Sequence, residues 1–419
     1  TEPPDEVNEP WTLADPADWV ARTPIDMIIV TPHGQTLPGG HGPSPDSPKS
    51  TGWADFNPRY AKGGQQAVYD TPPPRNASMI IRELIPYVEA HLPAIKGRSG
   101  RALGGVSYGS IGTGIVGLTY PDHFSSLLMM SGVGVIWPNA CSINDPDFGP
   151  FASPEPSPIS APSIGLQPAA DLLIDNQTVY LGAFGDGFTA DNVYARANHP
   201  PELLPNALAF RENAQILDFE ISVNDGIPYR AEDAQDPFSP IAAGLEIGLA
   251  YLPAQVMEQD AQRLGVEHRY AERKGLHTNP YWQPYFRQWL EQIYTRVQHW
   301  DGNGFSYPQP DRFNYRTIAR DFTIWDWPFT VEREPDEFLN LTDVSCDGMT
   351  LRGSGSVSFT IPAYCGTQYN GSRQVSIDLG ASPPVNEPYG AGNCQSWGHS
   401  VSLSFVDADG DGLTGLNDN

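Results

Sequence analysis

The sequence has little positive charge. Lysine and arginine number 24 against 50 aspartate and glutamate residues, so that a chain of 419 residues has a formal net charge of −26. An acidic surface of this kind repels nucleic-acid phosphates and anionic lipid headgroups. No basic tract offsets this charge locally, so we expect no nucleic-acid partner.

Long apolar runs and cysteines are also scarce. No run approaches the roughly 20 apolar residues of a membrane-spanning helix, and Thr1-Glu-Pro-Pro-Asp5 lacks the basic and apolar regions of a signal peptide. We expect no membrane span, and a signal that is either absent or already removed. The four cysteines form no C-x-x-C pair of the zinc or redox type, and Cys346, Cys365 and Cys394 lie in one late segment. This favours a disulfide there, and with it a secreted, extracellular protein of bacterial type.

Proline and glycine are abundant, with 42 and 41 residues, which indicates long loops. The chain length allows two or three domains, and we expect two. Up to about residue 300, strands and helices alternate, which is the pattern of a mostly parallel sheet flanked by helices. The expected strands are Met27–Thr31, 101–106, 124–131, 216–223 and 267–272, and the expected helices are 76–92, with a possible kink at Pro86, 111–118, 241–264 and 281–297.

Composition divides the chain further. Residues 137–213 are rich in Pro, Ser, Asn and Asp, which indicates an insertion or cap in a catalytic domain that spans 1–300. Short alternating segments separated by Gly and Pro turns follow, and they predict a small all-β sandwich-like domain over 301–406. Residues 407–419 form an acidic tail.

Gly105-Val-Ser-Tyr-Gly109 fits the pattern G-x-S-x-G between an expected strand and an expected helix. In that setting the serine lies on a strained turn that exposes its hydroxyl, so we predict Ser107 as a nucleophile. A hydroxyl needs a base to take its proton. His277 follows the last expected strand and precedes the last expected helix, where the chain order serine, acid, histidine places the base. Asp225, at the end of the strand 216–223, is our choice for the acid that orients the imidazole.

Four other carboxylates in the same region remain alternatives to Asp225: Glu232, Asp233, Asp236 and Glu246. Acyl transfer also needs donors for the developing oxyanion. The Tyr108 amide supplies one by position. Gln35, with Gly34 as an alternative, is predicted to supply the other from the loop after Met27–Thr31.

Several segments together resemble the esterase family that includes S-formylglutathione hydrolases, feruloyl esterases and mycolyltransferases. The matching stretches are Thr31-Pro-His-Gly-Gln35, Thr51-Gly-Trp-Ala-Asp55, Ile80–Leu92, Ala102–Gly109, Tyr120–Phe124, Met130-Ser-Gly132, Gly275-Leu-His277 and Tyr281-Trp282. The resemblance implies an α/β-hydrolase fold and serine ester chemistry that needs no cofactor.

The same resemblance implies that Trp53 and Trp282 line the substrate cleft, with buried packing as the alternative for each. In mycolyltransferases the acid is a glutamate near the start of a helix, which maps closer to Glu246. The function expected is hydrolysis of a small or polymeric carboxylic ester by a monomer. Two alternatives remain, namely acyl transfer to a sugar or lipid hydroxyl, and a polymer-binding protein with a polyester- or polysaccharide-ester-cleaving domain.

The acidic tail places oxygen ligands at Asp407, Asp409, Asp411 and Asp418, which are positions 1, 3, 5 and 12 of a calcium-type loop with Gly412 at the sixth. Position 12 is Asp where the EF-hand has a bidentate Glu. The spacing predicts a structural calcium site, and a solvated acidic terminus is the alternative.

Overall fold

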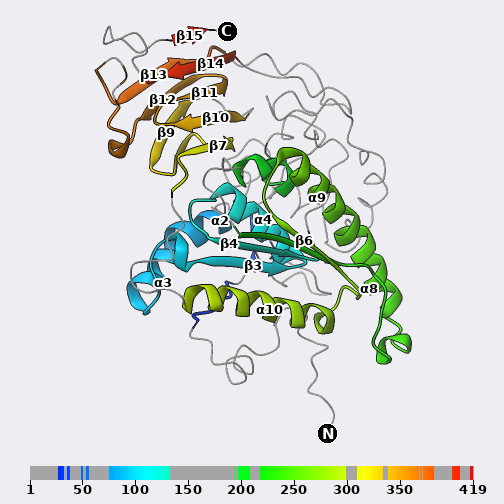
Figure 1. Ribbon diagram of the computed structural model, residues 1–419. Helices are drawn as coiled ribbons and strands as arrows, with labels where there is room; N and C mark the ends of the chain where they lie inside the picture. Colours follow the sequence, from blue (N-terminus) through cyan, green and yellow to red (C-terminus); the bar gives the residue numbers. More distant parts are fainter. Residues whose placement is uncertain are drawn as a thin grey trace.

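The computed structural model describes residues 27–32, 35–37, 49–50, 53–55, 75–132, 194, 197–207, 218–298, 309–333, 338–367, 369, 371–381, 399–405 and 416–418. These residues form a parallel sheet covered by helices, followed by two antiparallel sheets (Figure 1). Among the described helices, none has the length and apolar character needed to cross a membrane.

The parallel sheet has the strand order β3-β4-β5-β6. Its strands are β3 (Ala102–Val106), β4 (Ser126–Met130), β5 (Asp218–Asn224) and β6 (Arg269–Arg273), and every pairing is parallel. β4 is buried along its whole length, as expected for a strand covered on both faces. The carboxyl ends of all four strands therefore meet at one edge, where a site can be assembled.

Helices cover both faces of the sheet (Figure 1). Leu127 and Met129 of β4 pack with α4 (Tyr108–Thr119) and α9 (Leu252–Leu264), whereas Leu128 and Met130 pack with α10 (Asn279–Gln298). Burying one such side chain contributes about 1.5–3 kcal/mol. The alternation of β4 side chains thus holds the two helical layers around one sheet.

The expected helix over 76–92 is present as α2 (Asn76–Met79), the π-helical segment η2 (Ile80–Leu84) and α3 (Ile85–His91). Pro86 has no N–H to donate to the preceding turn, and the wider π turns lie immediately before it. The expected helix over 241–264 is likewise continuous, through α8 (Ser239–Leu245), the π-helical η9 (Glu246–Tyr251) and α9.

One predicted strand is wrong. Met27–Thr31 was expected to be buried, but Ile28, Ile29 and Val30 are 40%, 39% and 41% exposed, and in the described part of the chain this segment pairs with no strand. An apolar run indicates burial without specifying a hydrogen-bonding partner. The described sheet therefore has β3 at one edge.

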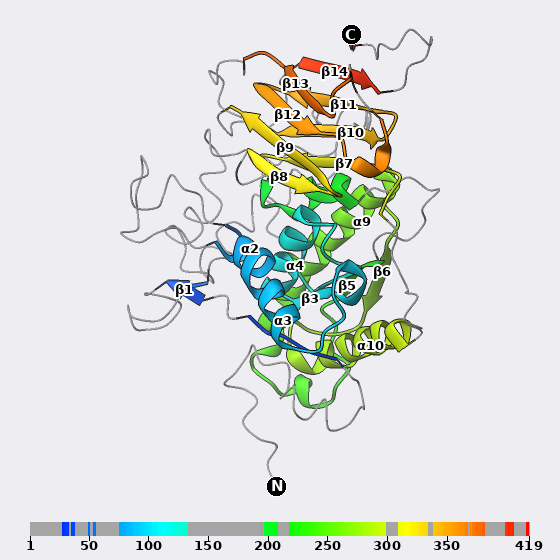
Figure 2. The same ribbon diagram turned by 90° about the vertical axis from the view of Figure 1, so that its left-hand side faces the viewer.

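The late segment forms two stacked antiparallel sheets, as the alternation predicts (Figure 2). One sheet has the order β15-β14-β11-β10-β7 and the other β13-β12-β9-β8. The bounds are β7 (Arg312–Thr317), β8 (Asp321–Ile324), β9 (Trp327–Glu332), β10 (Leu339–Ser345), β11 (Gly348–Gly353), β12 (Ser356–Thr360), β13 (Gln374–Asp378), β14 (His399–Ser404) and β15 (Leu416–Asp418).

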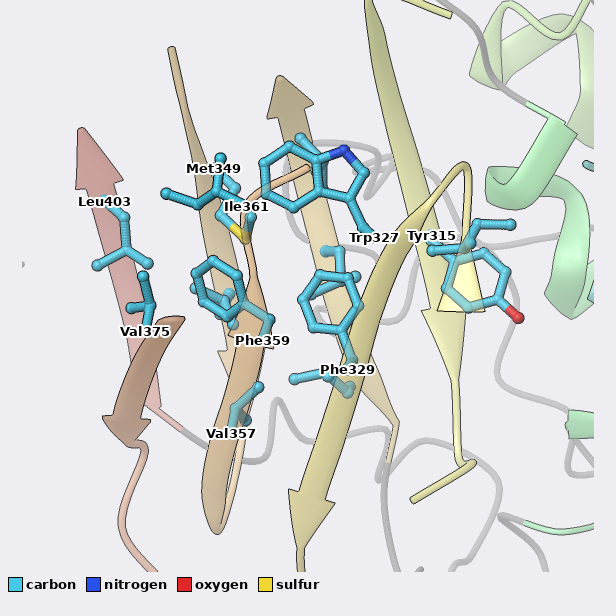
Figure 3. Close-up of a cluster of buried hydrophobic side chains, with 14 of the residues drawn as sticks. Tyr315, Trp327, Phe329, Met349, Val357, Phe359, Ile361, Val375 and Leu403 are labelled. Carbon is cyan, nitrogen blue, oxygen red and sulfur yellow. The ribbon is translucent and has the colours of Figure 1, made fainter. Parts of the chain in front are cut away.

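Aromatic and aliphatic side chains fill the space between these sheets (Figure 3). In β9, Trp327, Phe329 and Val331 point inward and alternate with exposed residues, which is the period of a half-buried strand. A disulfide joins Cys346 to Cys365, which confirms the expectation of a disulfide in this segment. Cys141 and Cys394 lie outside the described residues.

The part with the two antiparallel sheets is joined to the part with the parallel sheet through the end of α4. The Tyr315 hydroxyl of β7 donates to Thr119 O at 2.8 Å, and Asn206 Nδ2 donates to Leu118 O at 2.9 Å. Asn206 belongs to η6 (Pro200–Ala207), which is part of the predicted insertion 137–213, and η6 packs against α4, α9 and β7. This part of the insertion therefore connects the two halves of the molecule.

Candidate active site

Ser107 occupies a sharp turn between β3 and α4. Its φ of 55° and ψ of −120° lie in a region that residues with a side chain rarely adopt. The turn is held by the Ser107 amide, which donates to Met130 O at 2.8 Å, and by the Ser107 carbonyl, which accepts from Ser110 N at 3.0 Å. Backbone strain of this kind, of order 1–3 kcal/mol, persists where the surrounding contacts enforce it and is common at reactive side chains.

The close approach of two backbone segments explains why position 105 of the motif is a glycine. A Cβ on Gly105 would lie 2.1 Å from Gly109 O, and a Cβ on Gly132 would lie 2.3 Å from Ser107 O. A side chain at either position would therefore push the turn apart. Gly109 differs, because a Cβ there would meet no described atom within 4 Å.

His277 lies beside this serine, although the two residues are 170 positions apart in the sequence. The distance between Ser107 Oγ and His277 Nε2 is 2.8 Å, within the range for proton transfer. The loop after β6 carries the histidine, and its backbone amide donates to Ala242 O of α8 at 3.3 Å. The structure therefore brings together the two residues for which the sequence predicts nucleophile and base.

The carboxylate beside His277 belongs to Glu246. Glu246 Oε2 lies 2.6 Å from His277 Nδ1, and the side chain is fully buried. Its other oxygen, Oε1, accepts hydrogen bonds from Ser131 Oγ and from the amide of Asn224, both at 2.8 Å. A buried carboxylate that is held by two donors on one oxygen presents the other oxygen to the ring and can hold one imidazole tautomer.

The prediction of Asp225 as the acid is wrong. Asp225 Oδ1 accepts from the amide of Ile227 at 2.8 Å and from the amide of Gly275 at 3.2 Å, so its short side chain closes its own turn after β5. Glu246 starts the π-helical segment η9, and its longer side chain reaches the ring. It is the only charged residue between Ile241 and Leu252, a signal of burial that the sequence does contain.

The roles of both predicted oxyanion donors, Tyr108 and Gln35, stay predictions. Tyr108 is the first residue of α4, so its amide lies at the amino end of that helix, next to the Ser107 hydroxyl. Gln35 begins the short strand β1 (Gln35–Leu37), which pairs with β2 (Lys49–Ser50). Gly34 lies outside the described residues, and the role of Gln35 stays a prediction.

The two tryptophans predicted to line the cleft are both packed against other parts of the site. Trp282 is 8% exposed, and its ring stands edge-on to His277 with centroids 4.8 Å apart. Its indole N–H donates to Ser131 Oγ at 2.9 Å. Trp53 is half-buried, and a Cβ on Gly112 of α4 would lie 2.4 Å from its Cδ1. Trp53 thus packs on α4, and Trp282 contacts His277 and Ser131; a role for either ring in lining the cleft stays a prediction.

The predicted calcium ligands Asp407, Asp409 and Asp411 lie outside the described residues. Asp418 ends β15 and pairs with Val401, so this end of the acidic tail forms an edge strand. Within the described ranges, no group of three or more His, Cys, Asp or Glu residues is arranged to hold a metal ion. The calcium site stays a prediction.

Residues 24–156 match the family model described as "Putative esterase", which confirms the resemblance seen in the sequence. No curated protein matches the chain. Similar solved structures include a ferulic acid esterase, with 17% identity and a TM-score of 0.32, covering 54% of this chain and 63% of that one. The chain therefore spans somewhat less than two thirds of that protein.

Two further solved structures are similarly distant. Fluorophosphonate-binding serine hydrolase F of Staphylococcus aureus has 17% identity and a TM-score of 0.33, covering 57% of this chain and 68% of that one. An S-formylglutathione hydrolase from Agrobacterium tumefaciens has 13% identity and a TM-score of 0.33, covering 59% and 64%. These likenesses are too distant to carry an argument about chemistry.

Proposed function

We propose, taking the esterase-family segment 24–156 as the premise, that this protein hydrolyses carboxylic esters through an acyl-enzyme on Ser107. The observation that carries the proposal is one continuous chain of contacts. Ser107 Oγ lies 2.8 Å from His277 Nε2, and His277 Nδ1 lies 2.6 Å from Glu246 Oε2. A strained serine, an imidazole and a buried carboxylate in this order are the parts that acyl transfer requires.

In the first step the Ser107 oxygen attacks the carbonyl carbon of the ester. His277 Nε2 accepts the hydroxyl proton as the new C–O bond forms, and the resulting imidazolium is stabilised by the Glu246 carboxylate. When the tetrahedral intermediate collapses, the imidazolium gives this proton to the leaving alkoxide, which departs as the alcohol. The acyl group then remains on Ser107 as an ester.

In the second step water takes the place of the alcohol. His277 Nε2 accepts a proton from the attacking water, and the collapse of the second tetrahedral intermediate returns a proton to Ser107 Oγ. The products are a carboxylic acid and the regenerated serine. Each step develops negative charge on the carbonyl oxygen, and the proposed donors to it are the amides of Tyr108 and Gln35.

The Cys346–Cys365 disulfide supports a location outside the cytoplasm, because disulfides persist in oxidising compartments. We propose that the protein acts as an exported esterase on neutral or weakly charged esters. Its net charge of −26 would repel strongly anionic substrates.

A rate assay with p-nitrophenyl esters of increasing acyl length tests the hydrolysis. The wild type should release p-nitrophenol with a burst equal to one acyl-enzyme per molecule when deacylation is the slower step. His277→Ala should reduce kcat by a factor of about 10⁴ or more, because no other base contacts Ser107 Oγ among the described residues. His268→Ala is the matched control, since His268 contacts Glu258 and Val266 O, away from the triad. Equal loss in both variants, or no loss in His277→Ala, would contradict the proposal.

A further inference from the structure

The three residues at the carboxyl end of β4, Met130–Gly132, contact both the turn of the nucleophile and the acid. Met130 O accepts from the Ser107 amide, and Gly132 O accepts from the Ser110 hydroxyl at the start of α4. Between them, Ser131 Oγ lies 2.8 Å from Glu246 Oε1. Three successive residues therefore hold the nucleophile turn on one side and the triad carboxylate on the other.

Ser131 is itself fixed in an unusual conformation. Its φ is 49°, in the left-handed region, and its amide donates to Ser222 O of β5 at 2.8 Å. The residue is 1% exposed, so water does not compete for its hydroxyl. A strained, buried serine at this place indicates that the direction of its side chain matters to the site.

The direction of the Ser131 hydroxyl proton follows from its two partners. The indole N–H of Trp282, 2.9 Å away, can only donate, and an ionised carboxylate can only accept. The Ser131 oxygen therefore accepts from Trp282, and its proton points to Glu246 Oε1. The three groups form a one-way chain of hydrogen bonds that holds one carboxylate oxygen and turns the other, Oε2, toward His277.

Trp282 also contacts the base, His277, directly. Its ring lies edge-on to the imidazole of His277, at 89° between the planes. One side chain thus limits the rotation of the base and orients the hydroxyl that holds the acid. If Trp282 served only to pack against its neighbours, its ring would be sufficient and the hydrogen bond from its N–H would not be needed.

We propose that Ser131, oriented by Trp282, is a positioning residue for the triad. It holds the Glu246 carboxylate in the orientation that keeps the proton of His277 on Nδ1 and leaves Nε2 free to accept from Ser107. This inference rests on the proposed function, since it assigns a role within the same acyl transfer.

Two variants remove the hydrogen bonds and leave most of the packing in place. Ser131→Ala removes the donor to Glu246, and Trp282→Phe removes the indole N–H and keeps an aromatic ring near His277. The matched controls are Ser125→Ala, a buried serine whose hydroxyl donates to Arg101 O, and Trp289→Phe, a buried tryptophan of the same helix. In the described part of the chain, the Trp289 N–H meets no acceptor.

The readout is kcat per active site, with active sites counted by a fluorophosphonate titration. Loss of a hydrogen bond to a charged group corresponds to a decrease in kcat of about 10- to 100-fold, and KM should stay within about threefold. The controls should keep kcat within about threefold, while their melting temperatures fall about as far as those of the test variants. A merely structural role would change the melting temperature and leave kcat per titrated site unchanged.

A double-mutant cycle separates this role from a direct one. In a Glu246→Gln background, Ser131→Ala should change kcat by less than about threefold, because the carboxylate through which it acts is no longer there. Ser131→Ala with wild-type kcat, or a full additional loss in the Glu246→Gln background, would overturn the inference. Either result leaves the proposed function standing, whereas full activity in Ser107→Ala would remove the proposed function itself.

Discussion

Glu246→Gln exchanges one carboxylate oxygen for an amide nitrogen and is nearly isosteric. In the wild type, Oε1 accepts from Ser131 Oγ and Asn224 N, while Oε2 faces His277 Nδ1. In the variant the amide oxygen is expected to keep the two donors, which leaves the NH₂ group facing Nδ1. An NH₂ donor there selects the tautomer that is protonated on Nε2, and this tautomer cannot accept the Ser107 proton.

The expected loss follows from that tautomer. Replacing a triad carboxylate by its amide lowers kcat by about 10³- to 10⁴-fold, which corresponds to about 4–5.5 kcal/mol of activation free energy. The assay is p-nitrophenyl ester hydrolysis at several pH values, with thermal unfolding measured in parallel to show that the variant is folded. KM should change little, because the carboxylate makes no contact with the substrate in the proposed mechanism.

Asp225→Asn is the matched control for this prediction. Asp225 Oδ1 accepts two backbone amides, and the oxygen of asparagine can accept the same ones. We expect kcat within about threefold of the wild type and a stability change below about 1 kcal/mol. If Asp225→Asn lost 10³-fold and Glu246→Gln lost less than tenfold, the acid would be misassigned and the reasoning from the hydrogen bonds would fail.

Three further predictions concern stability. Tyr315→Phe should lower the free energy of unfolding in urea by about 1–2 kcal/mol, because it leaves the half-buried Thr119 carbonyl at the end of α4 without this donor. Burial raises the pKa of Asp260 to about 7, so the folded protein holds a proton that the unfolded chain has lost above about pH 4. Stability should fall as the pH rises from about 4 to 7, and Asp260→Asn should remove that fall when melting temperatures at pH 5 and pH 8 are compared; an unchanged difference would contradict it. Replacing Cys346 and Cys365 by serine opens a loop with a sequence separation of 19 and should cost about 3 kcal/mol in a denaturant titration, whereas an unchanged midpoint would show that the bond adds nothing.

The elements around Ser107 and His277 could be predicted because local chemistry specifies them. A glycine-rich strand-to-helix turn restricts Ser107 to one kind of conformation, and the histidine follows a strand whose partners in a parallel sheet end at the same edge. Ser107 and His277 therefore lie at the same edge of the sheet, whatever the conformation of the loops between them. The alternating residues of β12 and β13 predict the sandwich for a similar reason, since the period of a strand determines which side chains face inward.

The acid could not be predicted in this way. Its identity depends on how α8 and η9 pack against the loop of His277, which is a tertiary contact. Asp225 has the expected strand-end position but a side chain too short to leave its own turn, whereas Glu246 lies twenty-one positions further along, on a helix. Met27–Thr31 failed for a related reason, because hydrophobicity alone does not choose a strand partner.

The position of η6 is a second feature that the composition of residues 137–213 did not predict. Residues 137–213 were expected to form an insertion or cap, and in the described part of this segment Pro200–Ala207 packs against α4 and β7. Helix α4 therefore begins at the Ser107 turn and ends against groups from η6 and β7. The β-sheet part stabilises the helix that carries the site, in addition to any binding role of its own.

In the proposed mechanism, Ser107 carries the acyl group during turnover. Mass spectrometry of the protein quenched during hydrolysis of a slow p-nitrophenyl ester tests it most directly, with digestion to locate the added mass. We expect one acyl group per molecule on the peptide that contains Ser107, lost again as free acid forms, and no adduct in Ser107→Ala. An acyl group on a different residue, or full turnover by Ser107→Ala, would contradict it.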